Sequence, residues 1–279
     1  MMRGAACGLA LLLLMAWAGR SMADGKVVLR YRGAPGQVAV YRLSLKAAGE
    51  QVSLGERRPI NVEAEFELRE QVVATGPAES FSLELTATPV KTKDPTGTFG
   101  KNEGSRAPKV QVTLTPRGEA AASPLAGNHI GPYQRAFAAL MAEPSVVLPE
   151  EAVAVGEVWQ SRTAGTYRRS RLVAVRRSML GLVARIDSTI TGPVRLQEGS
   201  EGLGLNTSLS GNQTQRSTLQ LLTDRGVVLR DKGVTTSHTS GEIALELRGG
   251  VRRFPVRSQM RIVFDLRLVT LDGMPVKSD

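Results

Sequence analysis

The sequence predicts an all-β protein, built mainly from antiparallel strands that form a curved sheet or an unclosed β-barrel with one amphipathic helix. Three observations predict this fold class. Apolar and polar residues alternate in segment after segment. Turns rich in Gly and Pro separate these segments. Strands and helices nowhere alternate along the chain as a parallel α/β fold requires, which favours about a dozen strands in one antiparallel sheet.

The front half of the chain contains the clearest strand pattern. Over residues 60–69, every second position is apolar and the positions between are mostly charged. Residues 81–87 repeat the pattern after the turn at 75–77, so we expect a hairpin with one buried and one solvated face. The acidic residues of the first strand are expected to form a row of exposed charges (Glu63, Glu65 and Glu67).

The back half predicts two further hairpins. Residues 168–176 and 182–190 flank a turn at 178–181, and residues 217–222 and 227–232 flank a turn at 223–226 that ends in Arg-Gly. Weaker strand patterns cover 203–211, 242–247 and 259–271. No internal repeat divides the chain, so we expect a single β-rich domain over residues 24–279.

One amphipathic helix is predicted over residues 132–142, because its apolar residues recur three to four positions apart. A central connector over 144–159 follows it. Here Val153 and Val155 are expected to share one face of a short strand, and Gly156 to allow a bend where a side chain would clash. Trp159 is then expected to re-enter the core against Phe137 or Leu140 of the helix.

Residues 1–23 have the pattern of a secretory signal peptide, with a basic start, an apolar run and small residues before Ala23. The apolar run of about 14 residues is shorter than the roughly 20 that a spanning helix needs. Cleavage after Ala23 would remove Cys7, the single cysteine, so the mature chain is expected to form no internal disulfide. We expect an exported protein, periplasmic or extracellular, of bacterial origin.

The mature chain is basic, with 34 basic and 26 acidic side chains once Arg3 and Arg20 are removed with the signal peptide. Residues 158–186 contain seven arginines and no acidic residue. Three interpretations stay open: a solvated strand face, a site for an anionic component of the cell envelope, or a nucleic-acid site. Nucleic-acid binding is disfavoured because only Trp159 and Tyr167 could stack on bases there.

The sequence contains no recognisable catalytic motif and predicts no cofactor. Its histidines, His129 and His238, lie far apart and have no cysteine to join them, so no metal site is predicted. No serine lies in a nucleophile-elbow pattern. A hydrolase whose active site is assembled from scattered residues, with His129 or His238 beside carboxylates, stays open as the less favoured class.

The segment from Leu148 to Trp159, with its Leu-Pro start and its Val-x-Val-Gly-x-x-Trp end, resembles a segment found in a family of bacterial secreted all-β proteins of unknown function. More loosely, the layout resembles the unclosed β-barrels of periplasmic lipoprotein carriers and lipid-binding lipoproteins. That resemblance implies a curved sheet that wraps a helix around an apolar hollow. It implies no catalytic residue.

From the resemblance and the missing catalytic set we expect a non-catalytic extracytoplasmic protein that binds or carries a lipid or another amphiphilic ligand. The alternative is an envelope interaction or structural module with a basic surface. The candidate ligand-binding residues are Trp159, Arg168, Arg169 and Arg171, of which Arg169 and Arg171 share a strand face. Arginines at the mouth of a hollow could hold an anionic head group.

Overall fold

The computed structural model describes residues 25–95, 109–121, 145–163, 165–200, 205–247 and 250–276. The signal peptide predicted over 1–23 and the helix predicted over 132–142 lie outside these residues. Within them, none of the helices has the length and apolar character needed to cross a membrane.

Antiparallel strands account for nearly all of the described secondary structure, and this confirms the predicted fold class. The short strands are β1 (Lys26–Val27), β5 (Lys109–Leu114), β6 (Ala120–Ala121), β7 (Val153–Ala154), β8 (Val158–Thr163) and β14 (Met274–Pro275). The long strands are β2 (Val38–Ser53), β3 (Glu56–Thr75), β4 (Phe81–Lys93), β9 (Thr166–Ser178), β10 (Gly181–Ser200), β11 (Leu205–Leu222), β12 (Val227–Leu247) and β13 (Gly250–Leu271). A short 3-10 turn, η2 (Pro77–Glu79), joins β3 to β4.

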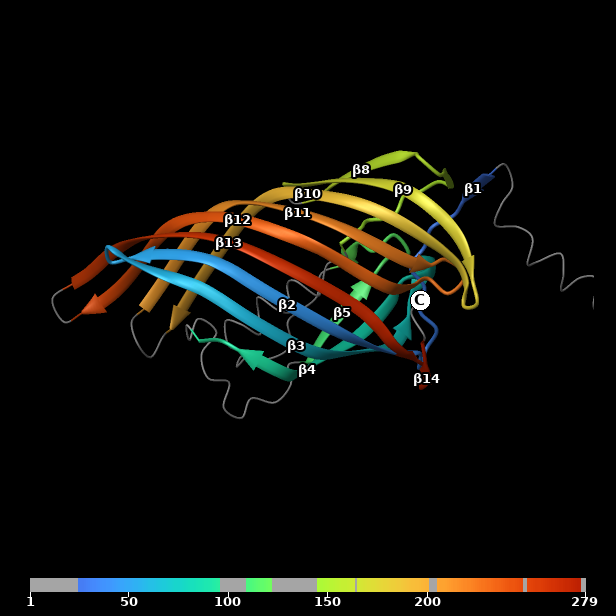
Figure 1. Cartoon of the computed structure of the whole chain (residues 1–279), viewed down its shortest axis with the longest axis horizontal. Coiled ribbons are helices and arrows are strands. Elements are labelled where there is room, and N and C mark those ends of the chain that lie inside the picture. Colours follow the sequence, from blue (N-terminus) through green and yellow to red (C-terminus); the bar gives the residue numbers. More distant parts are fainter. Residues whose placement is uncertain are drawn as a thin grey trace, which may run out of the picture.

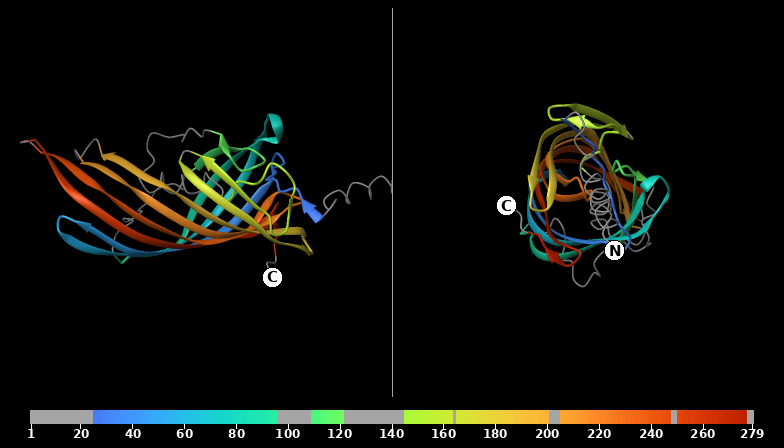
Figure 2. Two further views of the ribbon diagram at one scale, coloured as in Figure 1. Left: turned by 90° about the horizontal axis from the view of Figure 1, so that it is seen from above. Right: turned by 90° about the vertical axis from the view of Figure 1, so that its right-hand side faces the viewer.

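One large sheet has the strand order β6-β5-β4-β3-β2-β13-β12-β11-β10-β9-β8, and β14 pairs with the end of β13. Among the described residues no pairing joins β6 to β8, so the sheet curls without closing (Figure 1, Figure 2). The buried side chains lie on its concave side. One hydrophobic cluster joins Leu85 of β4 to Leu219 of β11, which are far apart in the strand order and meet only inside the curl.

Side chains alternate between this buried inner face and an exposed outer face. Eight apolar residues of β3 and β4 that were predicted to face the core are buried: Ile60, Val62, Ala64, Leu68, Phe81, Leu83, Leu85 and Ala87. Phe66, predicted to face the same way, is partly buried. The predicted hairpin turns at 178–181 and 223–226 are also confirmed, because β9 pairs with β10 and β11 pairs with β12.

Residues 145–149 form an extended segment on the inner face, which we call the strap. Val146, Val147 and Leu148 are buried. The Tyr31 hydroxyl donates a hydrogen bond of 3.0 Å to the carbonyl of Val146, and the Trp159 indole nitrogen donates one of 2.8 Å to the carbonyl of Val147. The strap is therefore held from both sides by aromatic side chains that also pack in the main core cluster.

The connector around Gly156 differs from the prediction in two respects. Val153 is buried, but Val155 lies beyond the two-residue strand β7 and is 56% exposed, so the two valines do not share a buried face. Gly156 has a φ of +97°, and a side chain there would meet only the end of Arg171, at 3.9 Å. Glycine is needed for its backbone conformation and not for lack of space. Trp159 packs partly buried against the core cluster; its expected helical partners lie outside the described residues.

Candidate functional site

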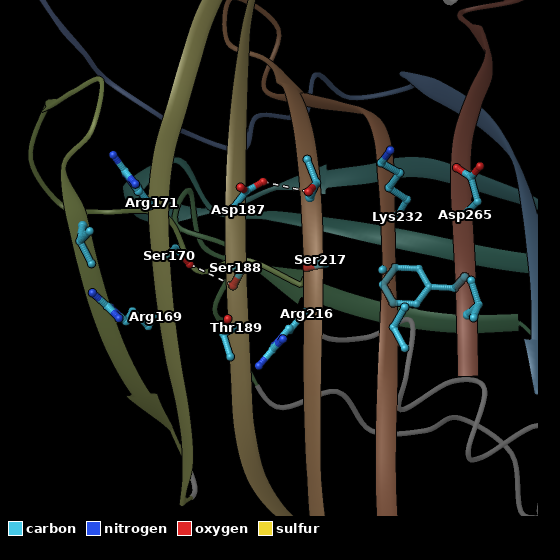
Figure 3. Close-up of a pocket in the computed structure, with 16 residues that line it drawn as sticks. Arg169, Ser170, Arg171, Asp187, Ser188, Thr189, Arg216, Ser217, Lys232 and Asp265 are labelled. Carbon is cyan, nitrogen blue, oxygen red and sulfur yellow. Dashed lines mark hydrogen bonds between the residues drawn. The ribbon is translucent and has the colours of Figure 1, made fainter. Parts of the chain in front are cut away.

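A shallow, open groove of about 730 Å³ crosses the outer face of the sheet from β8 to β13 (Figure 3). Cross-strand pairing arranges its walls as two rows of outward-facing side chains. The first row is Arg171, Asp187, Thr218, Lys232 and Asp265, and the second is Arg169, Thr189, Arg216, Val234 and Val263. Five strands at about 4.8 Å spacing give each row a length of about 19 Å.

The floor of the groove is backbone, because the residues between the two rows point to the inner face. These residues are Ser170, Ser188, Ser217, Gly233 and Phe264. The Ser170 and Ser188 hydroxyls share a hydrogen bond of 3.1 Å beneath it. The Phe264 ring packs under Gly233, where a Cβ would lie 2.8 Å from the ring. These contacts fix the strands that carry the walls.

The two acids in the groove wall are already engaged. Thr218 donates a hydrogen bond of 2.8 Å to Asp187. Asp265 accepts two hydrogen bonds from Arg230, at 2.9 and 2.7 Å, and two more from Arg267. Partial burial acts to raise the pKa of Asp265, but the hydrogen bonds and charges of these arginines outweigh it and hold the pKa below its usual range.

The four basic side chains of the walls make no ion pair with any described residue (Arg169, Arg171, Arg216 and Lys232). In Figure 3, Arg169 and Arg171 lean toward β8, while Arg216 extends toward β10. The outer face of β3 is different. Its acids were predicted to be exposed, and they lie beside basic residues of β2 and β4, with Lys46 and Glu63 3.1 Å apart. The basic residues of the groove are therefore left without the acidic partners that the basic residues beside β3 have.

The predicted ligand-binding residues fall into two groups. Arg169 and Arg171 are exposed and line the groove, on one strand face as predicted. Arg168 and Trp159 point to the inner face, where Arg168 is only 5% exposed and Trp159 holds the strap. The arginine pair therefore lies on the outer face of the sheet, and the expectation that it lies at the mouth of a hollow inside the sheet is wrong.

Sequence reasoning missed Arg216 and Lys232. They lie on β11 and β12, far along the chain from Arg169, and only the pairing of four strands places them in the same groove. Nothing in the sequence around them distinguishes them from other exposed strand residues.

A second polar cluster lies on the inner face near the strap. It contains Tyr31, Tyr41, Glu70 and Asp231. Burial raises the pKa of Glu70 to about 7, although a hydrogen bond from Tyr41 acts to lower it. Burial also raises the pKa of Asp231 to about 6, the Ser145 hydroxyl lowers it, and the charge of Asp265 adds to the rise. Burial thus disfavours the charged form of both carboxyl groups compared with a carboxyl group in water.

The described residues around His238 offer no carboxylate. His238 is exposed on β12, and its direct cross-strand neighbours are Asn212 and Gln259. His129 lies outside the described residues. Nowhere in the described ranges do three His, Cys, Asp or Glu side chains gather in a way that could hold a metal ion.

Comparison with known proteins identifies a structural likeness only. The sequence matches no protein-family model and no curated protein. Among solved structures, a study of lipid–protein interactions in lipovitellin contains a chain that is similar with a TM-score of 0.46 and 11% sequence identity. The match covers 88% of this chain and 26% of the lipovitellin chain, so this chain spans about a quarter of that protein's length.

Proposed function

We propose that this protein is a non-catalytic, extracytoplasmic binding protein whose outer groove holds the anionic head group of an amphiphilic ligand. One observation carries the proposal: Arg169, Arg171, Arg216 and Lys232 line one groove and find no acidic partner among the described residues. Hydrogen bonds from arginine to phosphate or carboxylate groups are strong, and they can form in pairs.

The second wall of the groove supports an amphiphile over a plain anion. From β9 to β13 its side chains change from Arg169, Thr189 and Arg216 to Val234 and Val263. A ligand with a charged head and an apolar chain could place the head between the arginines and the chain along the valines. The row of about 19 Å is long enough for such a molecule.

The second candidate function is an envelope interaction module that uses the same arginines to dock a polyanion or an acidic protein surface. The open shape of the groove favours this reading over an enclosed lipid site. The two candidates differ in their need for an apolar chain: a polyanion should bind whether or not the ligand carries one.

Short-chain lipids used below the concentration at which they form micelles test the proposal. We expect dihexanoyl phosphatidylglycerol to bind about 30-fold more tightly than dihexanoyl phosphatidylcholine, because Arg169 and Arg171 each contribute about 1 kcal/mol near an anionic head group. The double variant Arg169→Gln/Arg171→Gln should lose this preference and keep its thermal stability, since both side chains are exposed. Isothermal titration calorimetry measures the affinities.

The matched control is Arg257→Gln/Arg261→Gln, which removes two exposed arginines from the outer face of β13 outside the groove. This variant should keep the preference of the unmodified protein. Equal affinity for the two lipids in the unmodified protein would refute the proposed function. Equal affinity for phosphatidylglycerol and for glycerol phosphate without acyl chains would favour the interaction module.

A further inference from the structure

The turn between β9 and β10 displays apolar side chains in water. Met179 is 89% exposed and Leu180 is 41% exposed at the tip of this hairpin. The tip lies at the same end of the sheet as β1 and β14, and it protrudes there (Figure 1). Met274 of β14, 61% exposed, is a third exposed apolar side chain at this end.

The tip is held firmly in place. The Ser178 hydroxyl donates a hydrogen bond of 3.0 Å to the carbonyl of Gly181 and accepts one of 3.2 Å from the Leu180 backbone. The neighbouring turn at 223–226 supports it, because the Asp224 carboxylate accepts a hydrogen bond of 3.0 Å from the Leu182 backbone. Met179 and Leu180 are therefore presented by a braced hairpin and not by a loose loop.

Exposed arginines surround the tip. Arg176 and Arg177 lie near the end of β9, and Arg225 lies in the neighbouring turn. Arg32 joins them, since its backbone nitrogen donates to the carbonyl of Gly226 at 3.3 Å. None of the four forms an ion pair with a described residue, and the acid between them, Asp224, is engaged by the Leu182 backbone.

We propose that this hairpin tip docks the protein onto the surface of an anionic lipid bilayer, with Met179 and Leu180 entering the interfacial region and Arg176, Arg177 and Arg225 binding head groups. Burial of apolar side chains and attraction of basic residues to anionic lipids act together at membrane surfaces. The site is separate from the groove: Met179 follows Arg171 by eight positions along the chain, a distance of about 25 Å along a strand.

A membrane fits this tip better than a protein partner. A stable protein interface buries about 800 Å² on each side and uses 20–30 residues with matching shape. The tip is a small projection with two apolar side chains, and a bilayer surface accepts such a projection without a complementary pocket.

A second hairpin tip provides an internal control. Leu54, at the turn between β2 and β3, is 60% exposed and lies at the opposite end of the sheet. Its basic neighbours are paired, with Arg58 3.0 Å from Glu56 and Arg57 3.9 Å from Glu50. An exposed leucine without free positive charge around it should contribute little to binding an anionic membrane.

Sedimentation with large unilamellar vesicles tests the docking site. We expect the protein to bind vesicles of phosphatidylcholine and phosphatidylglycerol in a 3:1 ratio more tightly than pure phosphatidylcholine vesicles. The variant Met179→Ser/Leu180→Ser should bind the anionic vesicles about tenfold more weakly. Arg176→Gln/Arg177→Gln should lose the preference for anionic vesicles, and Leu54→Ser should bind like the unmodified protein.

Insertion itself is measured with Met179→Trp, whose indole fluorescence should shift to shorter wavelength when anionic vesicles are added. Unchanged vesicle binding by Met179→Ser/Leu180→Ser, or binding lost equally in Leu54→Ser, would overturn the docking site. Arg169→Gln/Arg171→Gln separates the two proposals. It should lose its preference for dihexanoyl phosphatidylglycerol while its vesicle binding still depends on Met179 and Leu180.

Discussion

Replacing Trp159 by alanine is expected to lower the free energy of unfolding by about 3 kcal/mol, the scale of a large-to-small change in a packed core. The indole packs against the main core cluster, and its nitrogen donates a hydrogen bond of 2.8 Å to the carbonyl of Val147 in the strap. The substitution removes the packed ring and leaves that carbonyl without its donor. Because the strap bonds to Trp159 of β8 and, through Leu148, to Arg117 in the turn between β5 and β6, its loosening should affect the core near both edges of the sheet.

Two further variants separate packing from hydrogen bonding. Trp159→Phe keeps an aromatic ring but removes the donor, and should cost about 1–2 kcal/mol. Val155→Ala, four residues away but 56% exposed, should change the stability by less than about 0.5 kcal/mol. Urea unfolding followed by far-ultraviolet circular dichroism measures all three. A loss below about 1 kcal/mol for Trp159→Ala would show that the strap does not depend on the indole.

The strands that line the core could be predicted because one side of each is apolar. Over residues 60–68 of β3 and 81–87 of β4 every second residue is apolar, so parity alone determined which of these side chains would be buried. The turn at 178–181 could be predicted for a related reason, because its Ser and Gly separate two segments in which apolar residues alternate with polar ones. Periodicity is a local signal, and it is strong where one strand face is dry.

The same signal fails in the far halves of β11, β12 and β13. The sequence predicted separate strands over 203–211, 217–222, 227–232, 242–247 and 259–271. In the structure β11 runs from Leu205 to Leu222, β12 from Val227 to Leu247 and β13 from Gly250 to Leu271. Backbone pairing with two neighbours holds these polar segments extended, whatever their side chains. Two glycines of these segments allow close contact between strands, because a Cβ on Gly211 or Gly241 would collide with a carbonyl of the adjacent strand.

Only two of the four basic residues of the groove could be predicted from the sequence, and the reason is geometric. Two residues of equal parity on one strand always share a face, so Arg169 and Arg171 could be paired from the sequence. Arg168 has the parity of Leu172, which is fully buried, and this signal could have placed it on the inner face. Arg216 could not be found, because its position beside Thr189 depends on the register of a hairpin between distant segments.

Raising the pH from about 4 to about 7 is expected to destabilise the protein through Glu70 and Asp231. Burial raises the pKa of Glu70 from 4.5 to about 7 in the folded chain, and the pKa of Asp231 from 3.8 to about 6. In this range the folded chain holds protons that the unfolded chain has released. The stabilising contribution is therefore complete below the unfolded pKa values and is lost as the pH passes the folded ones.

The variants Glu70→Gln and Asp231→Asn should each raise the free energy of unfolding at pH 8 by about 2 kcal/mol, and should have little effect at pH 4. Neutral amides replace carboxylates that would otherwise be charged in a buried place. Urea unfolding at intervals between pH 4 and pH 8 gives the free energy of unfolding of each variant and of the unmodified protein. Their difference at each pH removes the contributions of the other titrating groups.

Asp265 serves as the control of opposite sign. Arg230 and Arg267 hold its pKa below the usual range, so its stabilising contribution is present above the unfolded pKa and is lost as the pH falls. Asp265→Asn should therefore destabilise the protein at pH 8 and have a smaller effect as the pH is lowered. If the curves for Glu70→Gln and Asp231→Asn stayed parallel to that of the unmodified protein, the inner carboxyl groups would have ordinary pKa values. Asp231, which is buried, and Glu70, which is partly buried, would then both be hydrated as carboxyl groups in water are.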